Sequence, residues 1–259
     1  MTTILEVKNL TKQFGGLTAN QNISMSFEKG SITAVIGPNG AGKTTFFNMI
    51  TGVYQPTKGE ILLENEKING LKPHGVSEKG IARTFQNIRL FGEMSVIENV
   101  LVGMHTHLRA GLFGVLLNFP FVRKEEKKAE LVAYALLEYV GLSSLLNEKA
   151  CNLSYGAQRR LEIARALATK PKVILLDEPA AGMNPKETKD LTSLIKRMRH
   201  EQDVTVILIE HDMKLVMEIS EDIYVLDHGE KIAQGKPEEI RNNPKVIEAY
   251  LGTGAVKTG

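Results

Sequence analysis

The sequence predicts an α/β protein with an additional antiparallel sheet and an inserted helical segment. Short apolar runs at residues 32–36, 173–176 and 204–209 are typical of strands buried on both faces of a parallel sheet. Residues 5–27 contain stretches that alternate apolar and polar side chains, which favours half-buried antiparallel strands. Residues 94–168 instead show a helical period, so this segment interrupts the α/β order.

The N-terminal elements are predicted from spacing and from turn residues. Apolar residues spaced two apart indicate strands, whereas Gly37 and Gly52 are expected to end a strand and a helix. In chain order we expect strands at 5–7 and 23–27, a strand at 32–36, a helix at 44–51, and a hairpin formed by 60–63 and 67–68.

The helical segment and the C-terminal α/β part follow the same logic. Apolar spacings of three and four predict helices over 124–140, ended by Gly141, and over 156–168. Asn184 is the expected N-cap of a helix that begins at Pro185. The remaining predictions are strands at 173–176 and 204–209, a helix at 213–219, and a hairpin of 223–226 with 231–233.

Composition limits the class of protein. The chain has 259 residues, 42% of them hydrophobic, and 32 Lys and Arg against 30 Asp and Glu give a formal net charge of +2, which argues against a protein that coats a polyanion. No apolar run approaches the roughly 18 residues that span a bilayer, and no secretory signal is visible. The single cysteine, Cys151, cannot form an internal disulfide, so a reducing cytoplasm is the expected setting.

A glycine-rich loop lies between the predicted strand 32–36 and the helix that follows it. Residues 37–44 read Gly-Pro-Asn-Gly-Ala-Gly-Lys-Thr and match the phosphate-binding motif G-x-x-x-x-G-K-[ST] in the context that the motif requires. Glycines let backbone N–H groups turn toward phosphate oxygens, and the helix N-terminus adds partial positive charge. Lys43 would reach the β and γ phosphates, and the Thr44 hydroxyl would bind Mg²⁺.

Two carboxylates end the strand at 173–176. Ligands of open parallel sheets bind at the carboxyl ends of the strands, so Asp177 and Glu178 are placed beside the predicted phosphate loop. Asp177 suits the shell of a metal ion. Glu178 is expected to accept a proton from the attacking water or to orient it.

A second anion site is predicted at the start of the helix over 156–168. Residues 153–158 read Leu-Ser-Tyr-Gly-Ala-Gln, and Ser154 with the helix N–H groups could bind phosphate; alone, Ser154 would be an ordinary N-cap. One chain then has one loop that can hold a nucleotide, at residues 37–44, and a second segment that can bind phosphate, at residues 153–158. The simplest arrangement is a dimer in which each segment closes on the nucleotide of the partner.

With these motifs in this order, the sequence resembles the ATP-binding subunits of ABC transporters over nearly its whole length. The resemblance implies a P-loop ABC ATPase with a RecA-like core, an antiparallel β subdomain and an inserted α-helical subdomain. It divides the chain into a nucleotide-binding core (1–92 and 165–235), a helical subdomain with the signature motif (93–164) and a C-terminal tail (236–259). The ligands it implies are ATP and Mg²⁺.

The resemblance also assigns roles to single residues. Phe14 matches the aromatic that stacks on adenine, Gln86 the residue that senses Mg²⁺ and the γ-phosphate, and His211 the switch histidine. The implied catalytic residues are Glu178, His211 and Gln86, and the implied metal ligands are Thr44, Gln86 and Asp177. The implied nucleotide-binding residues are Phe14, Gly37, Asn39, Gly40, Ala41, Gly42, Lys43, Thr44, Thr45, Ser154 and Gly156.

Three positions depart from the family pattern. The signature usually reads L-S-G-G-Q, but Tyr155 stands at its first glycine and Ala157 at its glutamine. Gly156, the position nearest the phosphate in the family, is present. The segment after Glu178 usually carries an aspartate where this chain has Asn184.

Further segments are similar to the larger ATPase subunit of branched-chain amino acid importers. They include residues 85–91, 94–99, 209–214 and the tail 240–252. The resemblance implies integral membrane permease subunits as partners, a second identical or paralogous ATPase subunit, an indirect extracytoplasmic substrate-binding protein, and a peripheral place on the cytoplasmic face of the inner membrane. An ATPase of a lipid or lipopolysaccharide exporter is the near alternative, and a soluble ABC ATPase acting on nucleic acid or ribosomes is the distant one.

Smaller signals complete the expectations. Leu90 and Phe91 are too apolar for a simple exposed turn, so the loop 86–94 is expected to couple hydrolysis to a membrane partner. The apolar residues of 112–121 are expected to pack in the core, with docking on a membrane partner as the alternative. His105 and His107 are expected in an exposed loop without a metal.

Overall fold

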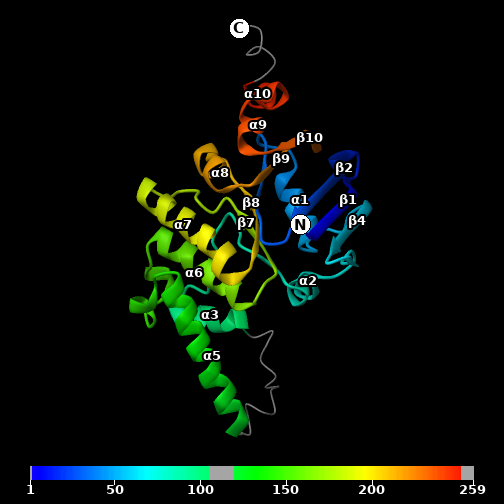
Figure 1. Cartoon of the computed structure of the whole chain (residues 1–259). Coiled ribbons are helices and arrows are strands. Elements are labelled where there is room, and N and C mark those ends of the chain that lie inside the picture. The colour runs from blue at the N-terminus through cyan, green and yellow to red at the C-terminus, as the bar shows by residue number, and fades with distance from the viewer. Residues whose placement is uncertain (1, 105–119, 252–259) are drawn as a thin grey trace.

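The central sheet joins strands that lie far apart in the sequence. The computed structural model (Figure 1) describes residues 2–104 and 120–251. Within them six strands pair in the order β10-β9-β3-β8-β7-β6. All neighbours are parallel except the β9–β10 hairpin. The strands are β3 (Ile32–Ile36), β6 (Ile81–Arg83), β7 (Val173–Asp177), β8 (Thr205–Ile209), β9 (Asp222–Asp227) and β10 (Glu230–Gly235).

Both faces of this sheet are covered, which explains the continuous apolar runs of its strands. Side chains alternate between faces along a strand, and in β7 Ile174 and Leu176 join the core on the side of the large helices, whereas Val173 and Leu175 join the core that contains α1 (Lys43–Ile50). A strand buried in this way shows no polar alternation in its sequence.

A second, antiparallel sheet packs against the α1 side. Its order is β2-β1-β4-β5, from β1 (Thr3–Phe14), β2 (Leu17–Glu28), β4 (Lys58–Leu63) and β5 (Glu66–Lys67). Leu5 pairs with Phe27 on one side and with Leu63 on the other, and all three side chains are buried. The alternation seen in the sequence therefore records one face turned to the core and one turned to solvent.

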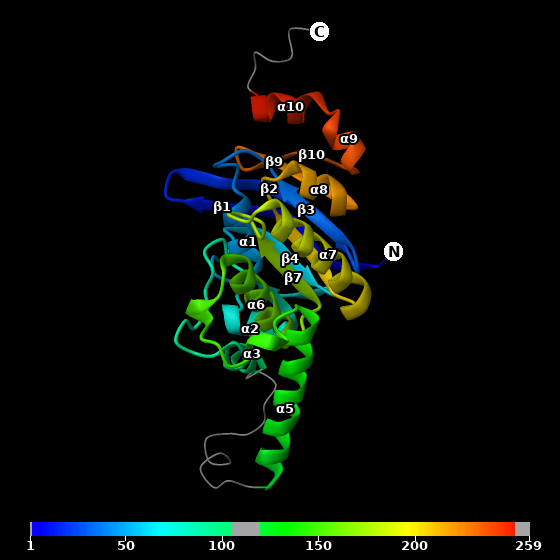
Figure 2. The same cartoon turned by 90° about the vertical axis from the view of Figure 1, so that its left-hand side faces the viewer.

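The helices of the other side form a bundle at one end of the molecule. The helices α3 (Val96–Met104), α5 (Pro120–Tyr139) and α6 (Tyr155–Ala168) pack together, and α5 extends away from the sheets in both views (Figures 1 and 2). The other helices in the described residues are α2 (Pro73–Lys79), α7 (Pro185–Gln202), α8 (Met213–Ile219), α9 (Pro237–Arg241) and α10 (Pro244–Leu251), with short 3-10 turns at Ser143–Leu145 and Ala150–Asn152.

The predicted elements are present, and most of their ends agree within four residues; β1 extends seven residues beyond its predicted end at residue 7, and β2 begins six residues before its predicted start at residue 23. Asn184 caps α7 as predicted, because its side chain accepts the N–H groups of Lys186 and Glu187. The elements α2, β6, α9 and α10 were not predicted, since three to eight residues are too few to establish a period. The predictions for 112–121, His105 and His107 fall outside the part of the chain that the structure describes.

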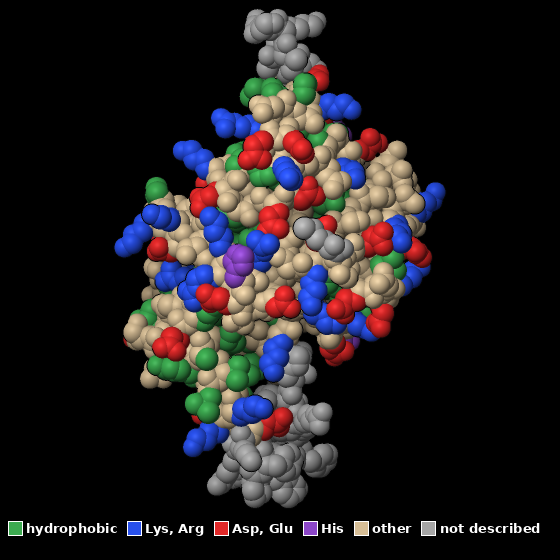
Figure 3. All heavy atoms as spheres, in the orientation of Figure 1, with side chains coloured by type: hydrophobic (Ala, Val, Ile, Leu, Met, Phe, Trp, Pro, Cys, Tyr) green, Lys and Arg blue, Asp and Glu red, His purple; other side chains and the backbone are tan. Residues whose placement is uncertain are grey.

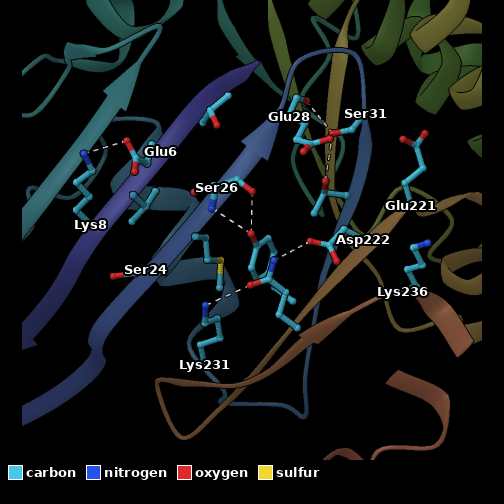
Figure 4. A pocket seen from close by; sticks show the side chains of 16 residues that line it. Glu6, Lys8, Ser24, Ser26, Glu28, Ser31, Glu221, Asp222, Lys231 and Lys236 are labelled. Carbon is cyan, nitrogen blue, oxygen red and sulfur yellow. Dashed lines mark hydrogen bonds and ion pairs between the residues drawn. The ribbon is translucent and has the colours of Figure 1, made fainter. Parts of the chain in front are cut away.

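A polar hollow of about 750 Å³ lies between the antiparallel sheet and the edge of the central sheet (Figure 4). Tyr224 bridges the two sheets there: its hydroxyl donates to the carbonyl oxygen of Ser26 at 2.7 Å and accepts the N–H of Ser26 at 3.0 Å. In the same hollow Gln234 donates to the Asp222 carboxylate at 3.0 Å. The two bonds of Tyr224 fix the antiparallel sheet to β9, and the Gln234 bond joins β10 to β9.

Across residues 2–104 and 120–251, no helix combines the length and the apolar character that crossing a membrane requires.

Candidate functional site

The loop from Gly37 to Gly42 connects β3 to α1, and its path admits no side chain at two of its glycines. Gly37 has φ +150°, and a Cβ there would lie 2.0 Å from the carbonyl oxygen of Leu226. Gly42 has φ +94°, and a Cβ there would lie 2.6 Å from the carbonyl oxygen of Ala19. Tight backbone packing therefore requires glycine and fixes the loop at the N-terminus of α1.

Lys43 is the first residue of α1, directly after this loop. The residue is 6% exposed, and its Nζ donates to the carbonyl oxygens of Gly37 at 2.7 Å and Pro38 at 2.9 Å. Burial lowers the pKa of Lys43 below 10.5, and the carboxylates of Glu178 and Asp177 oppose this shift. The loop thus holds a cation close to the two predicted acidic residues.

The other predicted loop residues are more accessible. Asn39, Gly40 and Thr44 are exposed and Thr45 is half-buried, whereas Ala41 lies in the core beneath the loop. Hydroxyl and amide groups on the outer side of the loop can therefore reach a ligand. Ala41 contributes through its backbone and its packing.

Asp177 ends β7 and forms a buried ion pair that the sequence analysis did not identify. Arg83 of β6 donates through Nη2 to Asp177 Oδ2 at 2.7 Å, and both side chains are about 5% exposed (6% and 5%). Arg83 also donates through Nη1 to Asn48 Oδ1 of α1 at 2.6 Å. Arg83 therefore connects the predicted metal-binding carboxylate to the helix that follows the phosphate loop.

Three predicted catalytic residues meet at Glu178. Gln86 Nε2 donates to Glu178 Oε2 at 2.8 Å, and His211 Nε2 lies 2.8 Å from Glu178 Oε1. Glu178 adopts a left-handed backbone with φ +47°, which is uncommon for a residue other than glycine and is typical of functional sites. The turn after β7 thus directs this carboxylate toward Gln86 and His211, which come from segments far apart in the sequence.

Glu210 holds the backbone around the predicted switch histidine. The residue is 3% exposed; its Oε1 accepts the N–H of Ala180 at 2.7 Å and its Oε2 accepts the N–H of His211 at 2.9 Å. The segments after β7 and β8 are therefore tied to each other. Glu210 was not predicted as a site residue, although an acidic residue directly after a buried strand is a signal for one.

The predicted second anion site lies at the start of α6, in the helical bundle, whereas the phosphate loop belongs to the sheet (Figure 1). Ser154 is the N-cap of α6, and its hydroxyl accepts the N–H of Ala157 at 3.4 Å. A Cβ on Gly156 would lie 2.6 Å from Glu187 Oε1, so a larger residue here would have to displace the Glu187 side chain of α7. Glycine at this position leaves room for that side chain.

Phe14 is 41% exposed at the end of β1 and has an aromatic neighbour. Its ring packs edge to face on Tyr54 with centroids 5.2 Å apart, and Lys12 Nζ lies 4.9 Å from the Phe14 centroid. Tyr54, in the loop after α1, was not identified from the sequence, where it stands only as an isolated aromatic. The two rings form an exposed aromatic surface suited to stacking.

The C-terminal helix α10 lies opposite the phosphate loop. A cavity of about 800 Å³ is bounded by residues 38–41 of the loop and by Lys245, Glu248 and Ala249 of α10. Partial burial raises the pKa of the Tyr250 hydroxyl, and a hydrogen bond with the Gly37 backbone opposes this shift. The tail therefore belongs to the surroundings of the site.

Comparison with known families gives two matches. Residues 20–181 match the family described as ABC transporter. Residues 230–256 match the family described as branched-chain amino acid ATP-binding cassette transporter, and this second segment includes α10.

The chain is also similar to characterised proteins over almost its full length. It is 53% identical to the high-affinity branched-chain amino acid transport ATP-binding protein BraF of Pseudomonas aeruginosa, covering 96% of this chain and 98% of that protein. It is 52% identical, with the same coverage, to the protein LivG of Escherichia coli K12, which has the same description.

Solved structures agree with this similarity. The ADP conformation of MJ1267, an ATP-binding cassette of an ABC transporter, superposes with a TM-score of 0.85 and 35% identity over 97% of this chain and 100% of that chain. A nucleotide-free ATP-binding cassette from an ABC transporter gives 0.84 and 37%, over 96% and 99%. The chain belongs to the ABC transporter family of ATP-binding proteins.

Proposed function

We propose that the chain hydrolyses ATP with Mg²⁺ at the interface of two ATPase subunits and couples this reaction to the import of branched-chain amino acids. The contacts of Glu178 with Gln86 and His211, beside a phosphate-binding loop, carry the proposal for hydrolysis. The descriptions of BraF and LivG as branched-chain amino acid transport proteins support the substrate class.

The phosphate loop is the proposed binding site for the triphosphate. The loop N–H groups, the side chain of Asn39 and the N-terminus of α1 would bind phosphate oxygens, and Lys43 would move its ammonium from the Gly37 and Pro38 carbonyls to the β and γ phosphates. Phe14, supported by Tyr54, would stack on the adenine.

The donor set beside the loop fits Mg²⁺. Asp177 offers a carboxylate, Thr44 an exposed hydroxyl and Gln86 an amide oxygen, and hard oxygen donors combined with substrate phosphates are what this ion prefers. A bound Mg²⁺ supplies neutralisation of the phosphate charge. Arg83 holds Asp177 through its Oδ2 and so fixes the direction of the carboxylate.

Glu178 is the proposed group that orients the attacking water and accepts its proton. Gln86 and His211 contact one carboxylate oxygen each, so they hold Glu178 between them before a water molecule arrives. His211 would also contact the γ-phosphate. Ser154 and Gly156 would act on the nucleotide of the second subunit, which completes the site when two subunits close.

Permease subunits are the proposed membrane partners. A groove of about 470 Å³ lies between the core and the helical bundle, and the exposed apolar side chains of Val53, Phe91 and Val102 line it. An apolar segment of a membrane protein could dock in this groove next to the loop that carries Gln86 (residues 85–91, the Gln86 loop). The chain would then lie on the cytoplasmic face of the inner membrane and act indirectly with an extracytoplasmic substrate-binding protein.

The alternatives have weaker support. Lipid or lipopolysaccharide export would use the same hydrolysis, and the relatives described above favour amino acid import over it. An action on nucleic acid would favour a basic surface, but Lys and Arg are interspersed with Asp and Glu on the face in Figure 3.

A transport assay tests the proposal. A strain that lacks the gene for this chain is complemented with the wild-type chain or with Glu178→Gln, and the uptake of radiolabelled leucine is measured. We expect uptake with the wild-type chain only, together with co-purification of permease subunits. Wild-type uptake with Glu178→Gln would contradict the hydrolytic role, and uptake of leucine independent of the chain would contradict the substrate class.

A further inference from the structure

The loop that carries Gln86 contacts a buried ion pair on α6. Arg159 Nη1 donates to Glu162 Oε2 at 2.8 Å, and the two side chains are 0% and 1% exposed. Neither residue has a part in the ATP chemistry described above. Because removing two charges from water is costly and a buried pair is weak support for stability, the pair needs another physical reason.

Both members of the pair bond the backbone of the loop. Arg159 Nη1 also donates to the carbonyl oxygen of Phe85 at 2.6 Å, and its Nη2 donates to the carbonyl oxygen of Gln86 at 2.8 Å. Glu162 Oε1 accepts the N–H groups of Phe85 and Arg89, each at 3.3 Å. Four backbone groups of an irregular segment therefore find their partners on one helix.

The other end of the loop is also tied to the helical bundle. Asn99 of α3 is fully buried; its Oδ1 accepts the N–H of Phe91 at 2.9 Å and its Nδ2 donates to the Phe91 carbonyl oxygen at 3.0 Å. By contrast, the N–H of Thr84 still donates to Leu175 of β7 at 2.9 Å. The chain thus passes from the sheet to the bundle between Thr84 and Phe85.

Tyr155 connects the same pair to the signature segment. Its hydroxyl lies 3.2 Å from Arg159 Nη2, which donates to it, and its ring lies beside Gly182, where a Cβ would be 3.4 Å from Cε1. The family pattern usually has glycine where this chain has Tyr155, and a glycine there could make neither contact. The departure at Tyr155 is therefore part of the same network.

Electrostatics are consistent with a network whose members depend on one another. Burial raises the pKa of Glu162, and the Arg159 charge together with the two backbone N–H groups opposes this shift. The same contacts that hold the loop therefore favour the ionised form of the carboxylate.

We propose that Arg159 and Glu162 are positioning residues that fix the Gln86 loop to α6, so that the placement of the signature helix determines the contact of Gln86 with Glu178. The inference rests on the proposed function, in which Gln86 and Glu178 serve hydrolysis. The segment from Ser154 to Gly156, which is proposed to act on the nucleotide of the second subunit, would then be linked directly to Gln86, which contacts Glu178.

Hydrogen exchange of the full-length chain tests the attachment itself. The double variant Arg159→Met/Glu162→Leu removes both charges together and leaves no unpaired buried charge, so we expect it to fold. Backbone amides of residues 85–89 should exchange at least about tenfold faster than in the wild type. The matched control is Arg160→Met, because Arg160 of the same helix faces a hollow lined by Glu138 and Asp190.

Unchanged exchange of residues 85–89 in the double variant would overturn the proposal. Glu162→Gln provides a second variant if the double variant unfolds, because it keeps an acceptor oxygen and loses the charge. Its amides at Phe85 and Arg89 should also exchange faster, and wild-type protection in this variant would equally overturn the proposal.

ATP hydrolysis tests the consequence for Gln86. The kcat of the double variant should fall at least about tenfold while the Kd for ATP changes less than about threefold. A triple variant that combines Gln86→Ala with the double variant should have the same kcat as Gln86→Ala alone, since both changes act through the Gln86 side chain. If the loss of kcat in the triple variant is the product of the two separate losses, the positioning role is overturned. If Gln86→Ala and Glu178→Gln both hydrolyse ATP at the wild-type rate, the proposed function is wrong. The hydrogen-exchange experiment would still show whether Arg159 and Glu162 hold the loop.

Discussion

Gln86 and Glu178, 92 positions apart in the sequence, lie with Nε2 and Oε2 separated by 2.8 Å, and the same carboxylate contacts His211 through its other oxygen. Each of the three residues follows a different strand of the central sheet, β6, β7 and β8, which are neighbours. Parallel strands bring their carboxyl ends to one edge, so this contact follows from the strand order.

Replacing Glu178 by glutamine should separate binding from hydrolysis. The amide keeps the size of the side chain but cannot accept a proton from water, so hydrolysis should fall at least about a hundredfold. The Kd for ATP should stay within about threefold of the wild type, and a closed dimer should accumulate on size-exclusion chromatography with ATP. Steady-state hydrolysis at the wild-type rate would refute the role assigned to Glu178.

The ion pair of Arg83 with Asp177 should be sensitive to the loss of one partner. Arg83→Met leaves the Asp177 carboxylate buried without its cation, and we expect a loss of about 3 to 5 kcal/mol in the free energy of unfolding. Urea denaturation measures this loss. The double variant Arg83→Met/Asp177→Asn should recover part of the stability, because no charge remains buried; a double variant as unstable as Arg83→Met would contradict this account.

Two glycines of the phosphate loop allow backbone strain to be separated from crowding. Gly40 and Gly42 have φ +83° and +94°, so alanine is strained at both, but a Cβ on Gly40 meets nothing within 4 Å whereas one on Gly42 lies 2.6 Å from the carbonyl oxygen of Ala19. Gly42→Ala should therefore be less stable than Gly40→Ala by about 1 to 3 kcal/mol in urea denaturation. Equal stability of the two variants would show that crowding is not what requires glycine at Gly42.

The parts of the site that could be predicted from the sequence are those formed by residues within one short stretch of the chain. The loop 37–44 was recognisable because glycine spacing, a preceding apolar run and a following helix all lie within one short stretch. Arg83 was missed because β6 has three residues, and its partners Asn48 and Asp177 lie 35 and 94 positions away. The buried pair on α6 was missed for a related reason: charged residues spaced by three on a helix most often lie on a solvated face, and only the docking of residues 85–89 buries them.

The shifted pKa of Lys43 predicts how ATP affinity responds to alkaline pH. Burial lowers the pKa of this ammonium, so its charge is lost as the pH rises through a value below 10.5. Phosphate binding needs that charge, and we therefore expect the Kd for ATP to rise at pH values below those at which an unburied lysine loses its proton. Equilibrium binding of a fluorescent ATP analogue measures it. An affinity that stays constant up to pH 10.5 would contradict the shift.

The groove beside the Gln86 loop should matter for transport more than for nucleotide binding. Phe91 is 47% exposed in this groove, whereas Leu90 is partly buried against the core, so only Phe91 can be changed without disturbing the packing beneath it. Phe91→Glu places a charge where an apolar partner segment is proposed to dock, and leucine uptake should fall at least about tenfold while the Kd for ATP changes less than about threefold. The control is Leu131→Glu, because Leu131 is 65% exposed on α5 and lies outside the groove. Equal losses of uptake and of ATP binding in Phe91→Glu, or an equal loss of uptake in Leu131→Glu, would contradict a docking role for this groove.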